Sequence, residues 1–135
     1  MSRRNLILCA LAAALASAPL SAGGPTLAAQ SSSVAGVKIT VEPKGFPRDA
    51  TTWTFAVTLE THTQDLDDDL VESTTLLAGG TPHRPLGWDG PPPGGHHRKG
   101  MLRFAAVTPL PQTVELQIRR AGEPAPRVFR WQTTR

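Results

Sequence analysis

Residues 53–60 read W-T-F-A-V-T-L-E and form the clearest strand in the sequence. Large apolar side chains stand at every odd position, and Thr, Ala or Glu stands at every even one. Because successive side chains of a β-strand point to opposite faces, this pattern buries one face and leaves the other in water. The stretch therefore predicts a half-buried β-strand.

The same period of two recurs in shorter segments on both sides of this strand. It is clear in residues 37–41 and 114–118 and near the end of the chain, where Phe129 and Trp131 alternate with polar residues. Three more strands are expected, at residues 74–78, 84–88 and 101–107. The 13 prolines and the lack of a helical period argue against helices. We therefore expect an all-β domain at residues 36–135, an immunoglobulin-like antiparallel β-sandwich of about seven strands.

The N-terminal segment is typical of an export signal. Arg3-Arg4 precede an apolar run from Leu6 to Ala16, and small residues follow as far as Ala22. The run is shorter than the roughly 20 helical residues that span a bilayer. We expect residues 1–22 to be a signal peptide for the general secretory or the twin-arginine route. Residues 23–35, rich in Gly, Ala and Ser, are expected to be a flexible lead-in. The mature protein is then exported, periplasmic or extracellular, with no membrane span.

The composition of the mature protein limits its possible partners and its sources of stability. Loss of Arg3-Arg4 leaves 12 basic against 11 acidic residues. No basic face interleaved with aromatic residues favours nucleic acid as a partner. The single cysteine, Cys9, leaves with the signal, so the mature domain has neither a disulfide nor a thiolate. Its hydrophobic core must therefore supply the stability.

Strand direction brings two polar loops to one end of the expected sandwich. If consecutive strands run up and down, residues 61–73 follow a descending strand. A hairpin turn at Gly79-Gly80 then returns the chain so that residues 89–100 reach the same end. Loops on a rigid sandwich commonly carry binding residues. We therefore expect the candidate site at this shared rim.

Imidazole and carboxylate groups on these two loops could together hold a divalent metal. The candidate ligands are His62, His96 and His97, with Asp65 or Asp67 completing the set. Nitrogen and oxygen ligands of this kind suit Cu(II) or Zn(II), and the lack of a cysteine excludes a blue-copper centre. Neighbouring residues are also expected to take part in binding, whether of the metal or of a protein partner at the same rim: Trp88, Asp89 and Arg98.

Three other interpretations of the rim stay open. In the first, the acidic loop and the basic loop form an ionic latch that is purely structural. In the second, Asp65, Asp67 and Asp69 hold Ca(II) in a loose site, although Leu70 replaces the glycine that an EF-hand requires. In the third, the backbone N–H groups and cations of residues 94–99 cradle an anion. No serine stands in a nucleophile signature, so we expect no enzymatic activity.

Three strings carry a resemblance to known proteins: F-A-V-T-L-E-T-H-T-Q-D-L at 55–66, W-D-G-P-P-P-G-G-H-H-R-K-G at 88–100 and R-V-F-R-W at 127–131. With them the chain resembles a family of small exported or membrane-tethered prokaryotic proteins of uncharacterised function. The second string is the most distinctive. The resemblance implies a domain marked by its histidine-bearing loops, and it implies no particular activity.

Overall fold

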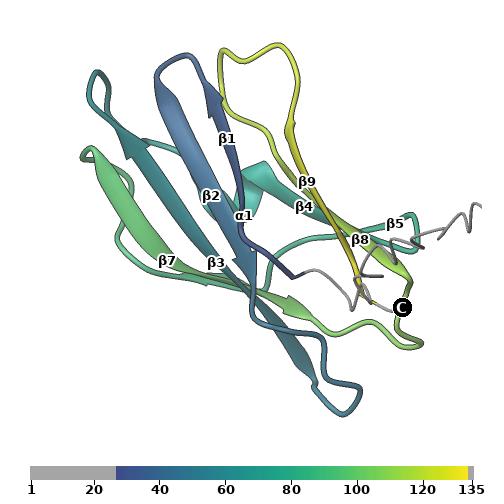
Figure 1. Cartoon of the computed structure of the whole chain (residues 1–135). Coiled ribbons are helices and arrows are strands. Elements are labelled where there is room, and N and C mark those ends of the chain that lie inside the picture. The colour runs from purple at the N-terminus through teal and green to yellow at the C-terminus, as the bar shows by residue number, and fades with distance from the viewer. Residues whose placement is uncertain (1–26, 134–135) are drawn as a thin grey trace, which may run out of the picture.

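Strands make up nearly all the regular structure of residues 27–133, the part of the chain that the computed structural model describes (Figure 1). In chain order the elements are β1 (Gln30–Val34), β2 (Val37–Pro43), β3 (Thr52–Thr61), α1 (Leu70–Ser73), β4 (Thr74–Ala78), β5 (Thr81–His83), β6 (Gly87–Asp89), β7 (His97–Ala105), β8 (Thr113–Ile118) and β9 (Arg127–Gln132). The single helix has four residues. The prediction of an all-β domain is confirmed.

The strands form two antiparallel sheets that pack face to face. One sheet has the order β1-β2-β3-β7-β6 and the other has the order β5-β4-β8-β9. This arrangement confirms the predicted antiparallel β-sandwich, whose immunoglobulin-like character stays a prediction. Within residues 27–133 there are nine strands rather than about seven. The two additional strands are β1 and β5, neither of which was expected.

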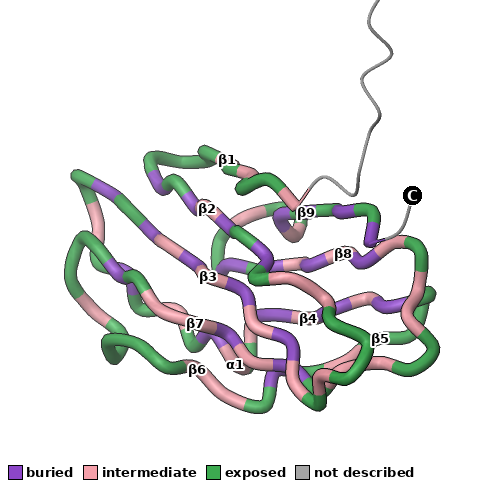
Figure 2. The backbone as a smooth tube through the Cα atoms, turned by 60° about the horizontal axis from the view of Figure 1, so that its bottom comes forward, coloured by how far each residue is buried: buried purple, intermediate pink, exposed green. Residues whose placement is uncertain are grey.

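β3 lies at the centre of its sheet and supplies much of the core. Its four large apolar side chains, those of Trp53, Phe55, Val57 and Leu59, are at most 2% exposed. In Figure 2 buried residues alternate with more exposed ones along this strand, as the period of two predicts. The Phe55 ring lies 5.5 Å from Phe104 of β7 and 5.8 Å from Trp131 of β9. The two sheets are thus joined by aromatic contacts.

The chain passes from one sheet to the other between β5 and β6. β4 and β5 are joined by the predicted turn at Gly79-Gly80, whose φ values of 60° and 82° suit glycine. Beyond β5, the Leu86 N–H donates to the Arg103 carbonyl, and β6 pairs with β7. Of the predicted strand at 84–88, only residues 87 and 88 are in a strand, β6, and β5 ends just before the predicted range. Pro85 is buried between them and has no N–H to continue a ladder.

β1 corrects the domain boundary that was expected at residue 36. Residues 30–34, expected to be flexible, pair with β2 over five positions. The Gln30 carboxamide bonds to both backbone groups of Arg130 in β9, with its Nε2 2.6 Å from the carbonyl and its Oε1 3.1 Å from the N–H. β1 therefore closes the gap between the two sheets at this edge. The expected signal peptide, residues 1–22, lies outside the described residues.

Candidate functional site

The two polar loops meet at one end of the sandwich, as strand direction predicted. Three backbone hydrogen bonds join them: Thr61 N–H to His96 O at 3.0 Å, Leu66 N–H to Gly95 O at 2.9 Å and Gly94 N–H to Leu66 O at 2.8 Å. Leu66 itself is fully buried in the core. The acidic loop is therefore anchored along the histidine-bearing loop.

Arg98 is the side chain that ties these loops together. It points inward from β7 and is 1% exposed. Its Nη1 donates to the carbonyls of Leu66 (3.3 Å) and Asp68 (2.7 Å), and its Nη2 donates to the Pro91 carbonyl (3.1 Å). Burial lowers the pKa of Arg98, and the carboxylate of Asp68 opposes that shift. Arg98 thus has a structural role between the two loops, and its predicted role in binding stays a prediction.

Trp88 and two glycines pack beside Arg98 and help to fix the loop at residues 90–96. The Trp88 Nε1 donates to the Pro91 carbonyl at 2.9 Å, and the Arg98 guanidinium lies 5.7 Å from the centre of its ring. A Cβ on Gly90 would lie 2.6 Å from the indole, and one on Gly100 would lie 2.5 Å from the Asp89 carbonyl. The distinctive string at 88–100 thus owes its Trp, two of its glycines and its Arg to local packing.

Asp89 is also occupied within the fold. Its Oδ2 lies 2.6 Å from the Nε of Arg103, its partner on β7. Together with Trp88, it was expected to contribute to binding. Both side chains instead make contacts within this string and its neighbouring strand.

A second buried ionic network, which was not predicted, closes the same end of the sandwich. Arg120 Nε lies 3.0 Å from Asp68 Oδ1, and Glu123 lies within 3.2 Å of both Arg120 and Arg127. The hydrogen bonds from Arg127 are the main cause that lowers the pKa of Glu123. Arg127 also donates to carbonyls of β1 and β2, at Ser32, Val34 and Val37. The network therefore runs from the acidic loop to the β1–β2 turn.

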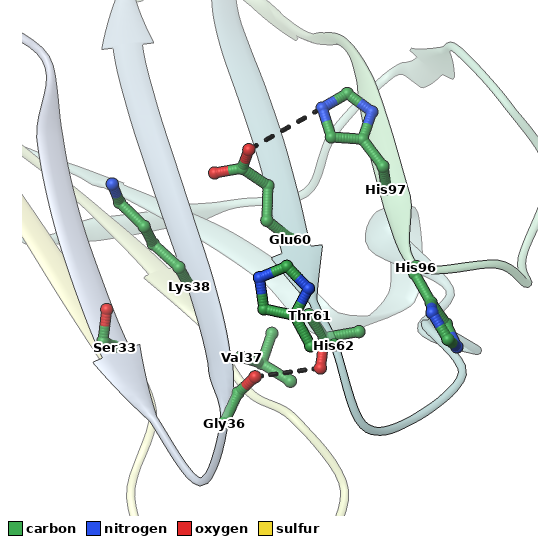
Figure 3. A pocket seen from close by; sticks show the side chains of 9 residues that line it. All are labelled: Ser33, Gly36, Val37, Lys38, Glu60, Thr61, His62, His96 and His97. Carbon is green, nitrogen blue, oxygen red and sulfur yellow. Dashed lines mark hydrogen bonds and ion pairs between the residues drawn. The ribbon is translucent and has the colours of Figure 1, made fainter.

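Beside this network lies an open groove of about 590 Å³, which we call the histidine groove (Figure 3). Its lining residues come from β1, β2, β3 and β7 and from the turns at their ends: Ser33, Gly36, Val37, Lys38, Glu60, Thr61, His62, His96 and His97. Strand register places Lys38 opposite Glu60, and Glu60 opposite His97. The His97 Nε2 is 3.9 Å from Glu60. The groove thus carries a row of three polar side chains, an ammonium, a carboxylate and an imidazole, across three strands.

The proposed metal ligands do not converge on one point. His62 and His97 line the groove, whereas Figure 3 shows His96 pointing away from the other two rings. Asp65 and Asp67 are exposed on the acidic loop and do not line the groove. Among residues 27–133 no group of three His, Cys, Asp or Glu side chains is placed to hold one metal ion. Binding of Cu(II) or Zn(II) therefore stays a prediction.

One of the three alternative calcium ligands, Asp69, has a structural role instead. The Asp69 Oδ1 caps the short helix α1 by accepting from the N–H groups of Val71 (3.1 Å) and Glu72 (3.2 Å). This local role explains why an Asp ends the acidic run. Binding of Ca(II) also stays a prediction.

The hydrophobic period of the sequence contains a signal for two of the buried arginines. Counting back by two from the inward Phe129 reaches Arg127, and counting back from the inward Leu102 reaches Gly100 and then Arg98. The period of two therefore places both arginines on the inner face. No comparable pattern identifies Arg120, whose partners Asp68 and Glu123 are brought to it by the fold.

Comparisons with known proteins add little to this geometry. No protein-family model matches the chain, and no curated protein matches its sequence. Among solved structures, a secreted protein of Mycobacterium tuberculosis, MPT63, is 16% identical with a TM-score of 0.41, over 71% of this chain and 87% of that one. That likeness is too low to carry an argument about this protein. In the described part of the chain, no helix has the length and apolar character needed to cross a membrane.

Proposed function

We propose that the protein is an exported, non-catalytic binding module whose ligand surface is the histidine groove. The observation that carries the proposal is the gathering of three of the four histidines around this groove. All three are exposed. A rigid frame surrounds them, because the loops that carry them are fixed by Arg98 and Trp88.

The residues of the distinctive string divide into two groups, which supports this assignment. Trp88, Gly90, Arg98 and Gly100 pack against one another or hold backbone groups in place. His96 and His97 have no such role, and the interaction of His97 with Glu60 is long at 3.9 Å and solvent-exposed. The fold therefore leaves the imidazoles free to meet a ligand.

The sheet edges make strand addition an unsuitable binding mode. Gln30 covers the backbone of Arg130 in β9, and the edge strand β1 is only five residues long. The other two edges, β5 and β6, are three residues long and have a proline within them or nearby. Short, blocked edges of this kind disfavour pairing with another strand. Side chains, rather than backbone, are the available binding groups.

Export and the lack of catalysis are the parts of the proposal that rest on sequence. Export rests on Arg3-Arg4 and the apolar run that follows them. The non-catalytic assignment rests on the missing nucleophile signature.

Site-specific photo-crosslinking in the native host tests the proposal. A benzophenone amino acid replaces His62 in the groove, and a matched control places it at the exposed Gln132 on β9. We expect a discrete adduct from position 62 that is absent from position 132. Equal adducts from both positions, or none from either, would contradict the assignment of the groove.

A divalent metal is the second candidate ligand of the same surface. What favours it is that two exposed imidazoles, those of His62 and His97, line the same groove. Calorimetric titration of the metal-free protein with Cu(II), Zn(II) and Ca(II) tests it. A designed site binds one ion with a Kd below about 1 µM and loses affinity in His62→Gln with His97→Gln. No heat above the buffer control rejects the metal and leaves the binding module in place.

A further inference from the structure

A second pocket lies at the end of the sandwich opposite to the histidine groove. It has a volume of about 370 Å³ and lies between the loops that join β2 to β3 and β7 to β8. Figure 1 shows the β2–β3 loop projecting at this end. We call this space the end pocket. Trp53 forms its floor, and Ala50, Ala106, Val107 and Leu110 are among the apolar residues around it.

The loops that frame the end pocket are held in place by contacts of their own. The Ala106 N–H donates to the Thr51 carbonyl at 3.0 Å, and the Lys44 N–H donates to the Thr54 carbonyl at 2.9 Å. The Phe46 ring packs edge-on against Trp53 with 4.9 Å between the ring centres. The pocket is therefore formed before any ligand arrives, which reduces the ordering cost of binding.

The chemistry of the lining is that of a small-molecule site. Such sites are mostly apolar, measure about 300–1,000 Å³ and carry a few polar groups that fix the ligand's orientation. The end pocket is at the lower end of that range, so its ligand must be small. Its one charged lining group is Arg48, which is exposed and makes no ion pair within residues 27–133. The neighbouring Asp49 does not line the pocket.

We propose that the end pocket binds a small carboxylic acid, with its acyl or aryl part against Trp53 and Leu110 and its carboxylate at Arg48. The apolar lining accounts for the hydrocarbon part, and the unpaired guanidinium accounts for the anionic head, which it can bind with two parallel hydrogen bonds. This site is independent of the histidine groove, since it lies at the other end of β3.

Titration of the isotope-labelled full chain with octanoate, followed by two-dimensional NMR, tests the proposal. We expect saturable shifts of the Ala50, Ala106, Val107 and Leu110 amide signals, with a Kd below about 1 mM, and no shift at Thr61 or His96. Arg48→Gln weakens binding by about two- to five-fold, as expected for an exposed charge pair, and the matched control Arg119→Gln leaves it unchanged. 1-Octanol, which lacks the charge, binds more weakly than octanoate.

Three results would overturn the proposal. Shifts that are absent or spread over the whole domain would show that the end pocket is not a ligand site. Equal affinity for octanoate and 1-octanol would remove Arg48 from the site. Shifts of the same residues when the protein alone is concentrated would identify the occupant as a second copy of the chain. Ala106→Leu, which adds bulk to the lining, provides a further check because it must abolish octanoate binding while the rest of the spectrum is retained.

Discussion

Arg98 bonds to three backbone carbonyls that belong to two different loops, and this makes it the most consequential single side chain at the rim. Its Nε is buried and has no hydrogen-bond partner among residues 27–133, so the arrangement also carries a cost. The histidines nearby are the reverse case, since they are exposed and lack structural partners of comparable strength. At the scale of residues, the rim therefore separates groups that hold the fold from groups that are free.

Replacing Arg98 with Met is expected to lower the free energy of unfolding by about 2–4 kcal/mol. The Asp68 carbonyl loses its only donor among residues 27–133, which costs about 1–3 kcal/mol. The carbonyls of Leu66 and Pro91 each lose one of two donors and keep the other, the Gly94 N–H and the Trp88 indole N–H. Urea denaturation measures the change. Lys99→Ala, at the exposed neighbouring position, is the control and should change stability by less than about 0.5 kcal/mol. Equal stabilities of the Arg98 variant and wild type would show that the loops do not depend on this side chain.

Gly100→Ala is expected to destabilise the protein by about 1–3 kcal/mol through overpacking. The added Cβ would lie 2.5 Å from the Asp89 carbonyl and 2.8 Å from the Gly90 Cα, and backbone atoms cannot move aside cheaply. Thermal unfolding and the Trp88 indole N–H signal report the effect. An unchanged midpoint and an unchanged indole signal would refute the close approach of β6 to β7.

At the scale of elements, the hydrophobic period explains which strands could be predicted. β2, β3 and β8 alternate apolar and polar residues, and each forms at the expected place within a few residues. β1 reads Q-S-S-S-V and has no apolar face, because its stability comes from pairing with β2 and from the Arg127 and Gln30 contacts to β9. Such long-range partners leave no local pattern in the sequence.

The candidate site shows the same division. The meeting of the two loops could be predicted, since it follows from strand direction and a Gly-Gly turn. The direction and the partners of the individual side chains could not be predicted. The direction in which His96 points and the pairing of Asp68 with Arg120 depend on backbone detail that residue type does not specify.

Deletion of β1 tests its role as part of the domain. A chain that begins at Val37 loses the Ser32 and Val34 carbonyls that Arg127 binds and the Ala28 carbonyl that accepts from the Trp131 indole at 2.8 Å. We expect its melting temperature to fall by at least about 10 °C relative to a chain that begins at Leu27, since roughly 1 kcal/mol corresponds to 4–8 °C in a domain of this size. Equal melting temperatures of the two chains would show that residues 30–34 are a lead-in that does not stabilise the domain.

At the scale of the whole molecule, buried arginines and carboxylates link the acidic loop, β9 and the β1–β2 turn into one closed end. Arg120, Glu123 and Arg127 are all nearly buried, so their pairing is strongly coupled to folding. The opposite end has the apolar end pocket instead. The sandwich thus has a polar end held by buried ion pairs and an opposite end with an open, mostly apolar pocket beside Trp53.

The polar end predicts how stability depends on pH. Hydrogen bonds from Arg127 and Arg120 lower the pKa of Glu123, so its stabilising contribution is complete above the ordinary carboxyl value of about 4.3. That contribution is lost as the pH falls through the lower value that Glu123 has in the folded protein. We expect Glu123→Gln to be less stable than wild type at pH 7 and to lose less stability on acidification. Parallel stability curves from pH 7 to pH 3 would contradict the role of Glu123.

The central claim is that Arg98 and Trp88 stabilise the loops at the rim, whereas the three histidines of the groove do not. Equilibrium unfolding of the triple variant His62→Gln, His96→Gln, His97→Gln tests this claim most directly. If the fold leaves these imidazoles free for a ligand, the free energy of unfolding stays within about 0.5 kcal/mol of wild type. A loss of about 2 kcal/mol or more would contradict the claim, because the histidines would then belong to the latch that holds the two loops together.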